Sequence, residues 1–91
     1  MTTYHLPPRL AVVIPEDVDA QLVYLMRAPD GPPVVLQDVS AVIWLLAADG
    51  EDDVAAAVGE VVGRDRGQVE TEVEKLLDDL IVRGLLTIRN D

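Results

Sequence analysis

The chain has 91 residues, 49% of them hydrophobic, and carries a formal net charge of -10 at pH 7. At this length it can form one small domain, whose folding buries about 60 to 65% of the surface of the unfolded chain. The absence of cysteine excludes disulfides, thiolate zinc sites and cysteine nucleophiles, and the acidic balance disfavours nucleic acid as a partner.

The N-terminal segment lacks the pattern of a targeting sequence. Residues 1–6 contain no basic stretch followed by an apolar run, and no apolar stretch approaches the roughly 20 residues that a membrane span needs. We therefore expect a cytoplasmic protein without membrane contact. We assign residues 1–7, ended by Pro7 and Pro8, to an N-terminal arm and residues 8–89 to a single domain.

Three short strands are predicted in the first part of the chain. Residues 9–14 are rich in β-branched side chains, and residues 21–27 show the clearest alternation in the chain, with two partly apolar faces. A dense turn signal at residues 29–33 separates them from a third strand at residues 34–37. This order predicts an antiparallel meander.

The hydrophobic period then changes to that of helices, and three are predicted. The first starts at Asp38 or Ser40, either of which can serve as its N-cap, and is apolar nearly all round, so we expect it to be the most buried. Asp65 and Gln68 have the spacing of a capping box at the start of the third. The predicted helices cover residues 38–49, 52–62 and 65–83, followed by Gly50, Gly63 and Gly84 respectively, and a short closing strand covers residues 85–88.

The third helix has an apolar face and a mixed shoulder beside it. At 100° per residue, the residues that centre the buried face are Val69, Val73, Leu76 and Leu80. The neighbouring stripe combines apolar and acidic side chains and consists of Glu70, Glu74, Leu77 and Ile81. One interpretation is an ordinary boundary of the core. The other is one wall of a groove with an apolar floor and an acidic rim.

The predicted fold class is α+β and winged helix-turn-helix-like, with an N-terminal three-stranded antiparallel sheet followed by three helices. In a winged helix of this order the third helix would read DNA. Here residues 69–83 of that helix have five carboxylates against Lys75 and Arg83, a net charge of -3. DNA binding depends on cations that neutralise phosphates, so nucleic acid is not an expected partner.

No catalytic, cofactor or metal site is predicted. His5 is the only histidine, so a histidine-centred triad or a site with two histidine ligands cannot be built from one chain. Residues 51–53 and the glutamates at 70, 72 and 74 lack the ligand spacing of a calcium loop and are interpreted as solvated helix faces. We therefore expect a protein that is not an enzyme.

The third strand offers a different kind of site. If residues 34–37 lie at an edge of the sheet, their free backbone N–H and C=O groups can pair with an extended peptide. Alternate side chains of such a peptide would enter pockets against the third helix. The predicted peptide-binding residues are Val34, Val35, Leu36, Gln37, Glu70, Val73, Glu74, Leu77 and Ile81.

Several blocks of the chain resemble a known family, the recognition elements for precursors of ribosomally synthesised and post-translationally modified peptides (RiPPs), typified by PqqD-like proteins. The resemblance covers roughly residues 8–89, and its most specific parts are Ile43-Trp44-Leu45-Leu46 and Gly84-Leu85-Leu86. The other matching blocks are Leu36-Gln37-Asp38, residues 41–42, Gly50, residues 54–58 and residues 73–80.

The resemblance implies that the chain captures the leader segment of a precursor peptide as an added strand between the third strand and the third helix. The chain is most similar to the stand-alone leader-binding proteins of lasso peptide biosynthesis. Those proteins deliver the precursor to a separate leader peptidase and an ATP-dependent macrolactam-forming cyclase. This implies a monomer or weak dimer whose partners are the leader peptide and these two enzymes.

Two alternatives stay open. One is a winged-helix transcriptional regulator. The other is an acyl-carrier-like protein, suggested by the single serine, Ser40, near a helix start, although Asp38-Val39-Ser40-Ala41 departs from the Asp-Ser-Leu motif of such carriers. The same junction departs from the RiPP family, where a Gly and an Asn are common, so the leader contacts at this corner are the least defined.

Overall fold

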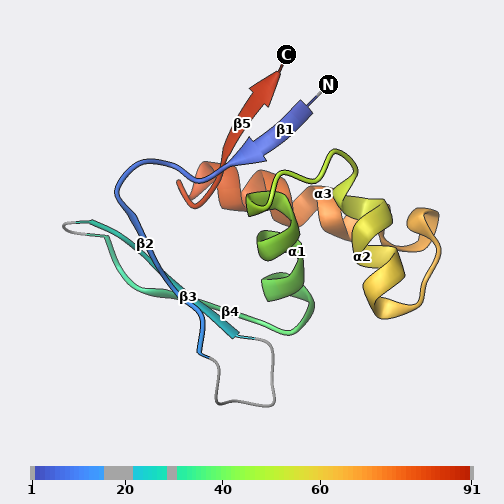
Figure 1. Cartoon of the computed structure of the whole chain (residues 1–91), viewed down its shortest axis with the longest axis horizontal. Coiled ribbons are helices and arrows are strands. Elements are labelled where there is room, and N and C mark those ends of the chain that lie inside the picture. Colours follow the sequence, from blue (N-terminus) through green and yellow to red (C-terminus); the bar gives the residue numbers. More distant parts are fainter. Residues whose placement is uncertain (1, 16–21, 29–30, 91) are drawn as a thin grey trace.

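The computed structural model describes residues 2–15, 22–28 and 31–90. Within these residues the chain forms a three-stranded antiparallel sheet of order β2-β3-β4, three helices, and a separate two-stranded sheet that pairs β1 with β5 (Figure 1). The elements are β1 (Thr2–His5), β2 (Leu10–Val13), β3 (Leu22–Arg27), β4 (Val34–Gln37), α1 (Val39–Ala48), α2 (Val54–Val62), α3 (Arg66–Val82) and β5 (Thr87–Asn90). The predicted α+β fold class and the predicted antiparallel sheet are confirmed.

The sheet of β2, β3 and β4, which we call the meander sheet, has one buried and one exposed face. On β3, Val23 and Leu25 are buried in the core, whereas Tyr24 and Met26 face outward and are 41% and 40% exposed. This is the alternation that the sequence predicted for this strand. Gln21, which the prediction included, lies outside the described residues.

The pairing of β1 with β5 was not predicted. Residues 2–5, which we placed in an N-terminal arm, pair with residues 87–90 in antiparallel register, so that Tyr4 lies opposite Ile88 (Figure 1). The closing strand begins two residues later than expected because Leu85 and Leu86 are buried in the core. We call this pair the terminal sheet.

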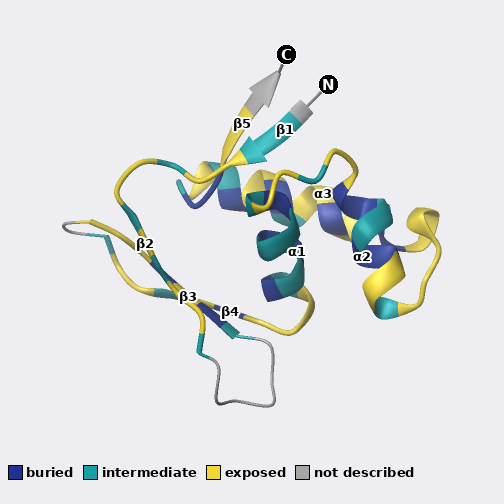
Figure 2. Cartoon of the chain, in the orientation of Figure 1, coloured by how far each residue is buried: buried dark blue, intermediate teal, exposed yellow. Residues whose placement is uncertain are grey.

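The core lies where the three helices and the inner face of the meander sheet meet (Figure 2). Trp44 is the largest fully buried side chain, and its indole Nε1–H donates a hydrogen bond of 3.1 Å to the carbonyl oxygen of Leu85. A buried indole needs such a partner, because an unpaired N–H would lose its hydration without compensation. This bond connects α1 to the segment that follows α3.

Helix α1 is the least exposed of the three helices, as expected, although it has no more fully buried residues than α2. Four residues are buried in each of these helices, and Val39 at the start of α1 is 45% exposed. Its apolar sequence is only partly covered, because the few neighbouring elements of so small a domain cannot surround a helix.

The helix ends follow the predicted capping chemistry in part. Asp53 caps α2 by accepting a hydrogen bond of 3.1 Å from the backbone N–H of Ala56, and the backbone N–H of Asp65 donates to Gln68 Oε1 at 3.0 Å. Asp38 precedes α1 but makes no capping hydrogen bond through its side chain. Gly84 has φ of +76° and follows α3, as the left-handed conformation after a helix favours glycine.

The buried face of α3 is rotated relative to the prediction. Val69, Val73 and Leu80 are buried as expected, but Leu77 takes the fourth buried position and Leu76 is only half-buried. Leu77 lines a cavity together with Tyr4 of β1. The strand that the sequence did not predict therefore covers the side of α3 that was expected to be a shoulder.

At Gly59 the backbone of α2 lies close to the backbone of the turn that follows this helix. This close packing can be tested by substitution. A Cβ atom at Gly59 would lie 2.6 Å from the carbonyl oxygen of Arg64, whereas one at Gly67 would meet nothing within 4 Å. We expect Gly59→Ala to lower the free energy of unfolding by about 1–3 kcal/mol through overpacking. Gly67→Ala is expected to raise it by about 0.4–1 kcal/mol, because alanine restricts the unfolded chain.

Urea denaturation followed by circular dichroism measures both variants. Equal effects from the two substitutions would contradict the close approach of Gly59 to the turn between α2 and α3.

Candidate functional site

Strand β4 is an edge strand. It pairs with β3 on one side, in the register Tyr24 to Val35 and Val23 to Leu36, and no other strand of the described residues pairs with its second edge. Leu36 is buried, whereas Val35 is 45% exposed. The free edge of a strand presents backbone N–H and C=O groups that can pair with another chain.

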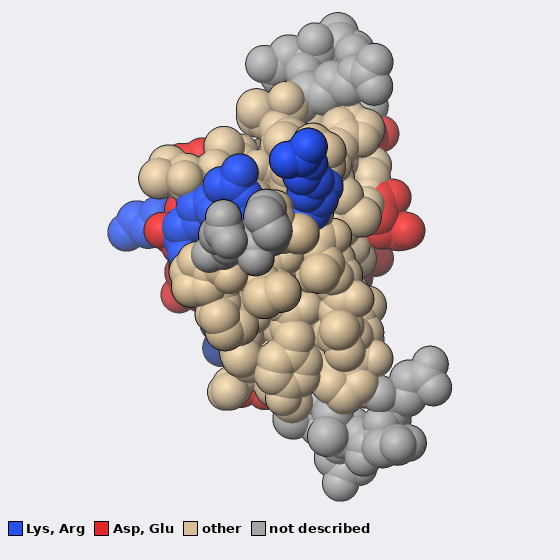
Figure 3. All heavy atoms as spheres, turned by 90° about the vertical axis from the view of Figure 1, so that its left-hand side faces the viewer, with Lys and Arg blue, Asp and Glu red and all other residues tan. Residues whose placement is uncertain are grey.

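The face of the meander sheet that turns away from the helices is apolar as well. Val13, Tyr24 and Val35 lie side by side in register across the three strands and are all at least 41% exposed. Seen from this side, uncharged residues cover most of the surface (Figure 3). An antiparallel sheet with one solvated face usually places polar side chains there, so this surface is unusually apolar around β4.

The junction between β4 and α1 contains a bend at Asp38. Its φ of +55° lies in the region that favours glycine, and Val39 begins the helix directly after it. The bend turns the chain from the sheet edge into α1, which packs against both β4 and α3. The glycine that is common at this junction in the RiPP recognition family is absent here. Asp38 nevertheless adopts a backbone conformation that is typical of glycine.

An apolar cavity of about 140 Å³, which we call the Val39 cavity, opens beside this junction. Val39 and Ile43 of α1 form one side of it, and Val69 and Val73 of α3 form another. Its other lining residues are Val58, Val62, Arg64 and Glu72. Val39 follows the last residue of β4 by only two positions, so the lining of this cavity begins close to the end of that strand.

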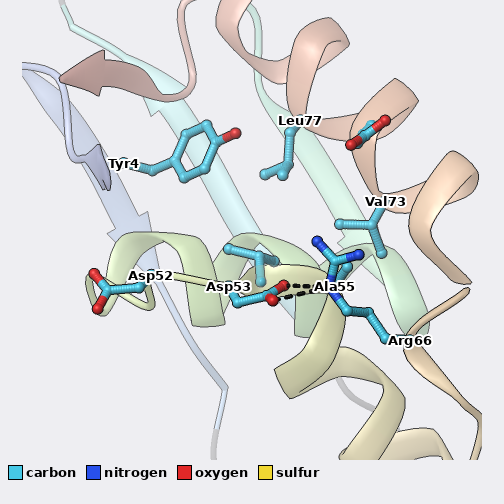
Figure 4. Close-up of a pocket in the computed structure, with 9 residues that line it drawn as sticks. Tyr4, Asp52, Asp53, Ala55, Arg66, Val73 and Leu77 are labelled. Carbon is cyan, nitrogen blue, oxygen red and sulfur yellow. Dashed lines mark hydrogen bonds and ion pairs between the residues drawn. The ribbon is translucent and has the colours of Figure 1, made fainter. Parts of the chain in front are cut away.

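A second cavity, which we call the Tyr4 cavity, has a volume of about 240 Å³ and lies beside the terminal sheet (Figure 4). Tyr4 comes from β1, and Val73, Glu74 and Leu77 come from α3. The other lining residues are Asp52, Asp53, Val54, Ala55 and Arg66. Its floor is apolar, and its charged residues lie at the rim.

An ion-pair network crosses the rim of the Tyr4 cavity. Arg66 Nε lies 2.8 Å from Asp53 Oδ2, and Arg66 Nη1 lies 2.9 Å from Glu70 Oε2. The hydrogen bonds from the Ala56 backbone and from Arg66 lower the pKa of Asp53 below its usual range, and the same carboxylate raises the pKa of Arg66. Asp53 therefore caps α2 and connects it to α3 at once.

The structure divides the nine predicted peptide-binding residues between separate surfaces. Val34, Val35, Leu36 and Gln37 lie on β4, while Glu74 and Leu77 line the Tyr4 cavity and Val73 lines both cavities. Neither the Tyr4 cavity nor the Val39 cavity contains members of both groups. Leader contact by Glu70, Glu74, Leu77 and Ile81 stays a prediction.

Sequence reasoning missed Val39, Glu72, Tyr4 and the Asp53 to Arg66 pair as candidate site residues. Val39 was assigned only to a helix start, and Tyr4 to an arm. The apolar run from Val39 onward was the available signal for the first cavity, because an apolar residue in the first turn of a partly covered helix remains accessible. Nothing in residues 2–5 alone indicated that Tyr4 would reach α3.

The described residues limit the chemistry of these sites. Among them, no group of three or more histidine, cysteine, aspartate or glutamate side chains could hold a metal ion. None of the helices in this part of the chain is long and apolar enough to span a membrane. The arrangement offers a strand edge and two small hollows, which suit the binding of a peptide or a side chain.

Comparison with known proteins gives one match. The family model for coenzyme PQQ synthesis protein D (PqqD) matches residues 15–86, which is well over half of the chain. No curated protein and no solved structure matches the chain. The matched range includes β4, all of α1, α2 and α3, and the Val39 cavity, but not Tyr4.

Proposed function

The chain belongs to the PqqD family of RiPP precursor peptide recognition domains, and we propose that it binds the leader segment of a precursor as a strand added to β4. Members of this family bind a precursor peptide and associate with biosynthetic enzymes. The observation that carries the proposal is the free edge of β4, which ends two residues before Val39 of the Val39 cavity.

The added strand would be held by its backbone and selected by its side chains. The free N–H and C=O groups of residues 34–37 pair with the leader backbone, which fixes its direction and register. Where the leader passes the bend at Asp38, an apolar side chain enters the Val39 cavity, whose lining is mostly valine and isoleucine. Glu72 and Arg64 at this cavity then favour polar or charged neighbours on the leader.

The exposed apolar face around Val35 supports the same site. A leader strand beside β4 would extend the sheet, and its outward side chains would continue the apolar row that runs from Val13 through Tyr24 to Val35. Cross-strand contacts of this kind contribute about 0.2–1 kcal/mol each. They would add to the main-chain hydrogen bonds without requiring a particular leader sequence.

We further propose that the precursor is a lasso peptide and that the chain delivers it to a leader peptidase and a macrolactam-forming cyclase. Holding the leader raises the effective concentration of the adjoining segment at these enzymes, so the chain assists the reaction by proximity and carries out no chemical step itself. The resemblance of this small acidic chain to the leader-binding proteins of lasso peptide biosynthesis supports this assignment.

A matched pair of substitutions tests the leader site. Val39 lines the cavity at the end of β4, whereas Val82 is 85% exposed and lines neither cavity. Calorimetric titration would use synthetic peptides that cover the leader and the core of the precursor encoded beside this chain. We expect the leader alone to bind, and Val39→Lys to weaken it by about tenfold or more, because a leader side chain docked in the hollow would bury the added charge, which is costly.

Val82→Lys adds the same charge away from the site and is expected to leave the affinity unchanged. Equal binding of leader and core peptides, or equal losses from both substitutions, would refute the proposed site.

A further inference from the structure

The Tyr4 cavity has the shape and lining of a receptor for one amphipathic side chain. The ring of Tyr4 and the side chains of Val73 and Leu77 point toward the same space, and the Asp53 to Arg66 ion pair lies at its edge (Figure 4). Val54, Ala55, Val73 and Leu77 are each at most 5% exposed, so the floor is apolar and firmly packed. A ligand here would have an apolar stem.

The rim carries more negative charge than its one cation neutralises. Arg66 is already shared between Asp53 and Glu70. Among the described residues, Asp52, Glu74 and Asp78 form no ion pair. Burial, and then the charges of Asp78 and Glu74, raise the pKa of Tyr4, which means that both carboxylates act on the phenol from the side of α3. The head group of a ligand here would be a cation.

The volume of the cavity fits an amino-acid side chain better than a cofactor. Sites for drug-sized ligands and cofactors occupy about 300–1,000 Å³. The Tyr4 cavity, at about 240 Å³, is smaller and open at its rim. A guanidinium is the best match among protein cations, because its plane can stack on the face of Tyr4 and its fork can pair with carboxylates.

The cavity and the proposed leader site lie on the two flanks of the buried face of α3, and Val73 at the centre of that face lines both cavities. Glu74 lines the Tyr4 cavity and Glu72 lines the Val39 cavity, and two residues along a helix are separated by about 200°. In Figure 1 the terminal sheet, which carries Tyr4, and β4 lie at opposite ends of α1. A leader strand on β4 therefore leaves the Tyr4 cavity free for a second partner.

We propose that the Tyr4 cavity receives an arginine side chain from the surface of a biosynthetic enzyme, so that the chain holds the enzyme beside the terminal sheet and the leader at the edge of β4. The identity of the partner as an enzyme rests on the proposed leader-binding function. The preference of the cavity for an arginine side chain is independent of that function.

A small-molecule titration tests the cavity without any partner protein. N-acetyl-arginine amide would be titrated into the full chain and followed by the ring resonances of its two tyrosines, Tyr4 and Tyr24. We expect a saturable shift at Tyr4 that weakens with added salt, and no shift at Tyr24, which lies on the outer face of the meander sheet. The uncharged analogue N-acetyl-citrulline amide should give no saturable shift.

Two variants of the same charge change then assign the partner. Glu74→Lys should abolish the Tyr4 shift and weaken binding of the purified leader peptidase or cyclase encoded beside this chain by about tenfold or more, and the leader affinity of the same variant is measured beside them. Glu60→Lys, at an exposed position of α2 that lines neither cavity, should retain the Tyr4 shift and the enzyme affinity. Thermal unfolding followed by circular dichroism checks that both variants remain folded.

Each contrary result overturns a distinct part of the proposal. An equal response to the citrulline analogue, or a Tyr4 shift that survives Glu74→Lys, would refute the arginine site. Loss of leader affinity in Glu74→Lys would assign the cavity to the leader, and unchanged affinity for both enzymes would refute the enzyme as its occupant. Failure of the leader site itself shows separately, in the Val39→Lys titration.

Discussion

A proline on the free edge of β4 is expected to weaken leader binding by about 5- to 150-fold without unfolding the protein. Proline lacks the backbone N–H, so the partner carbonyl of the leader would be left unpaired, at a cost of about 1–3 kcal/mol. Val34 and Val35 are the positions to compare, because successive residues of a strand direct their N–H groups to opposite sides. One of the two variants faces the leader and the other faces β3.

The variant that faces β3 should lower the free energy of unfolding, since it removes a hydrogen bond of the meander sheet. Calorimetric titration with the leader peptide and urea denaturation of each variant separate the two effects. Val35→Ala is the control, because it removes an exposed side chain but retains the N–H group. If both proline variants kept the wild-type leader affinity, strand addition to β4 would be untenable.

Replacing Trp44 by alanine is expected to cause the largest loss of stability, about 3–5 kcal/mol. The side chain is 2% exposed, and its removal leaves a cavity at the centre of the core. A domain of this length has a total free energy of unfolding of about 5–14 kcal/mol, so the variant would be marginally folded at best. Urea denaturation followed by far-ultraviolet circular dichroism measures the loss without relying on tryptophan fluorescence.

Trp44→Phe separates packing from hydrogen bonding. Phenylalanine retains most of the apolar contact but leaves the carbonyl oxygen of Leu85 without its donor, which is expected to cost about 1–3 kcal/mol. A loss below about 1 kcal/mol in the alanine variant would show that Trp44 is not central to the core.

The features that the sequence predicted well depend on local patterns. The strand at residues 34–37, the alternation along β3 and the capping box of Asp65 and Gln68 each follow from residues within a few positions of one another. Turn signals and capping residues act at this range, which is why the order of the elements could be predicted.

The candidate site could be predicted only in part because its surfaces depend on distant contacts. Helical periodicity placed Leu76 on the buried face of α3, but the contact of Leu77 with the Tyr4 cavity depends on a strand more than 70 residues away. The positive φ of Asp38 could not be predicted from the sequence either, since aspartate rarely adopts a positive φ. Sequence reasoning therefore found the edge strand but assigned the shoulder of α3 without knowing what covered it.

The terminal sheet also affects the order in which the protein can be completed during synthesis. Among the described residues, β1 pairs with no strand except β5, which spans residues 87–90. Of the described strands, β1 is synthesised before the others but must wait for β5, whereas the meander sheet and α1 consist of contacts that are available earlier. The Tyr4 cavity is consequently the final surface to form, after the edge of β4 is already in place.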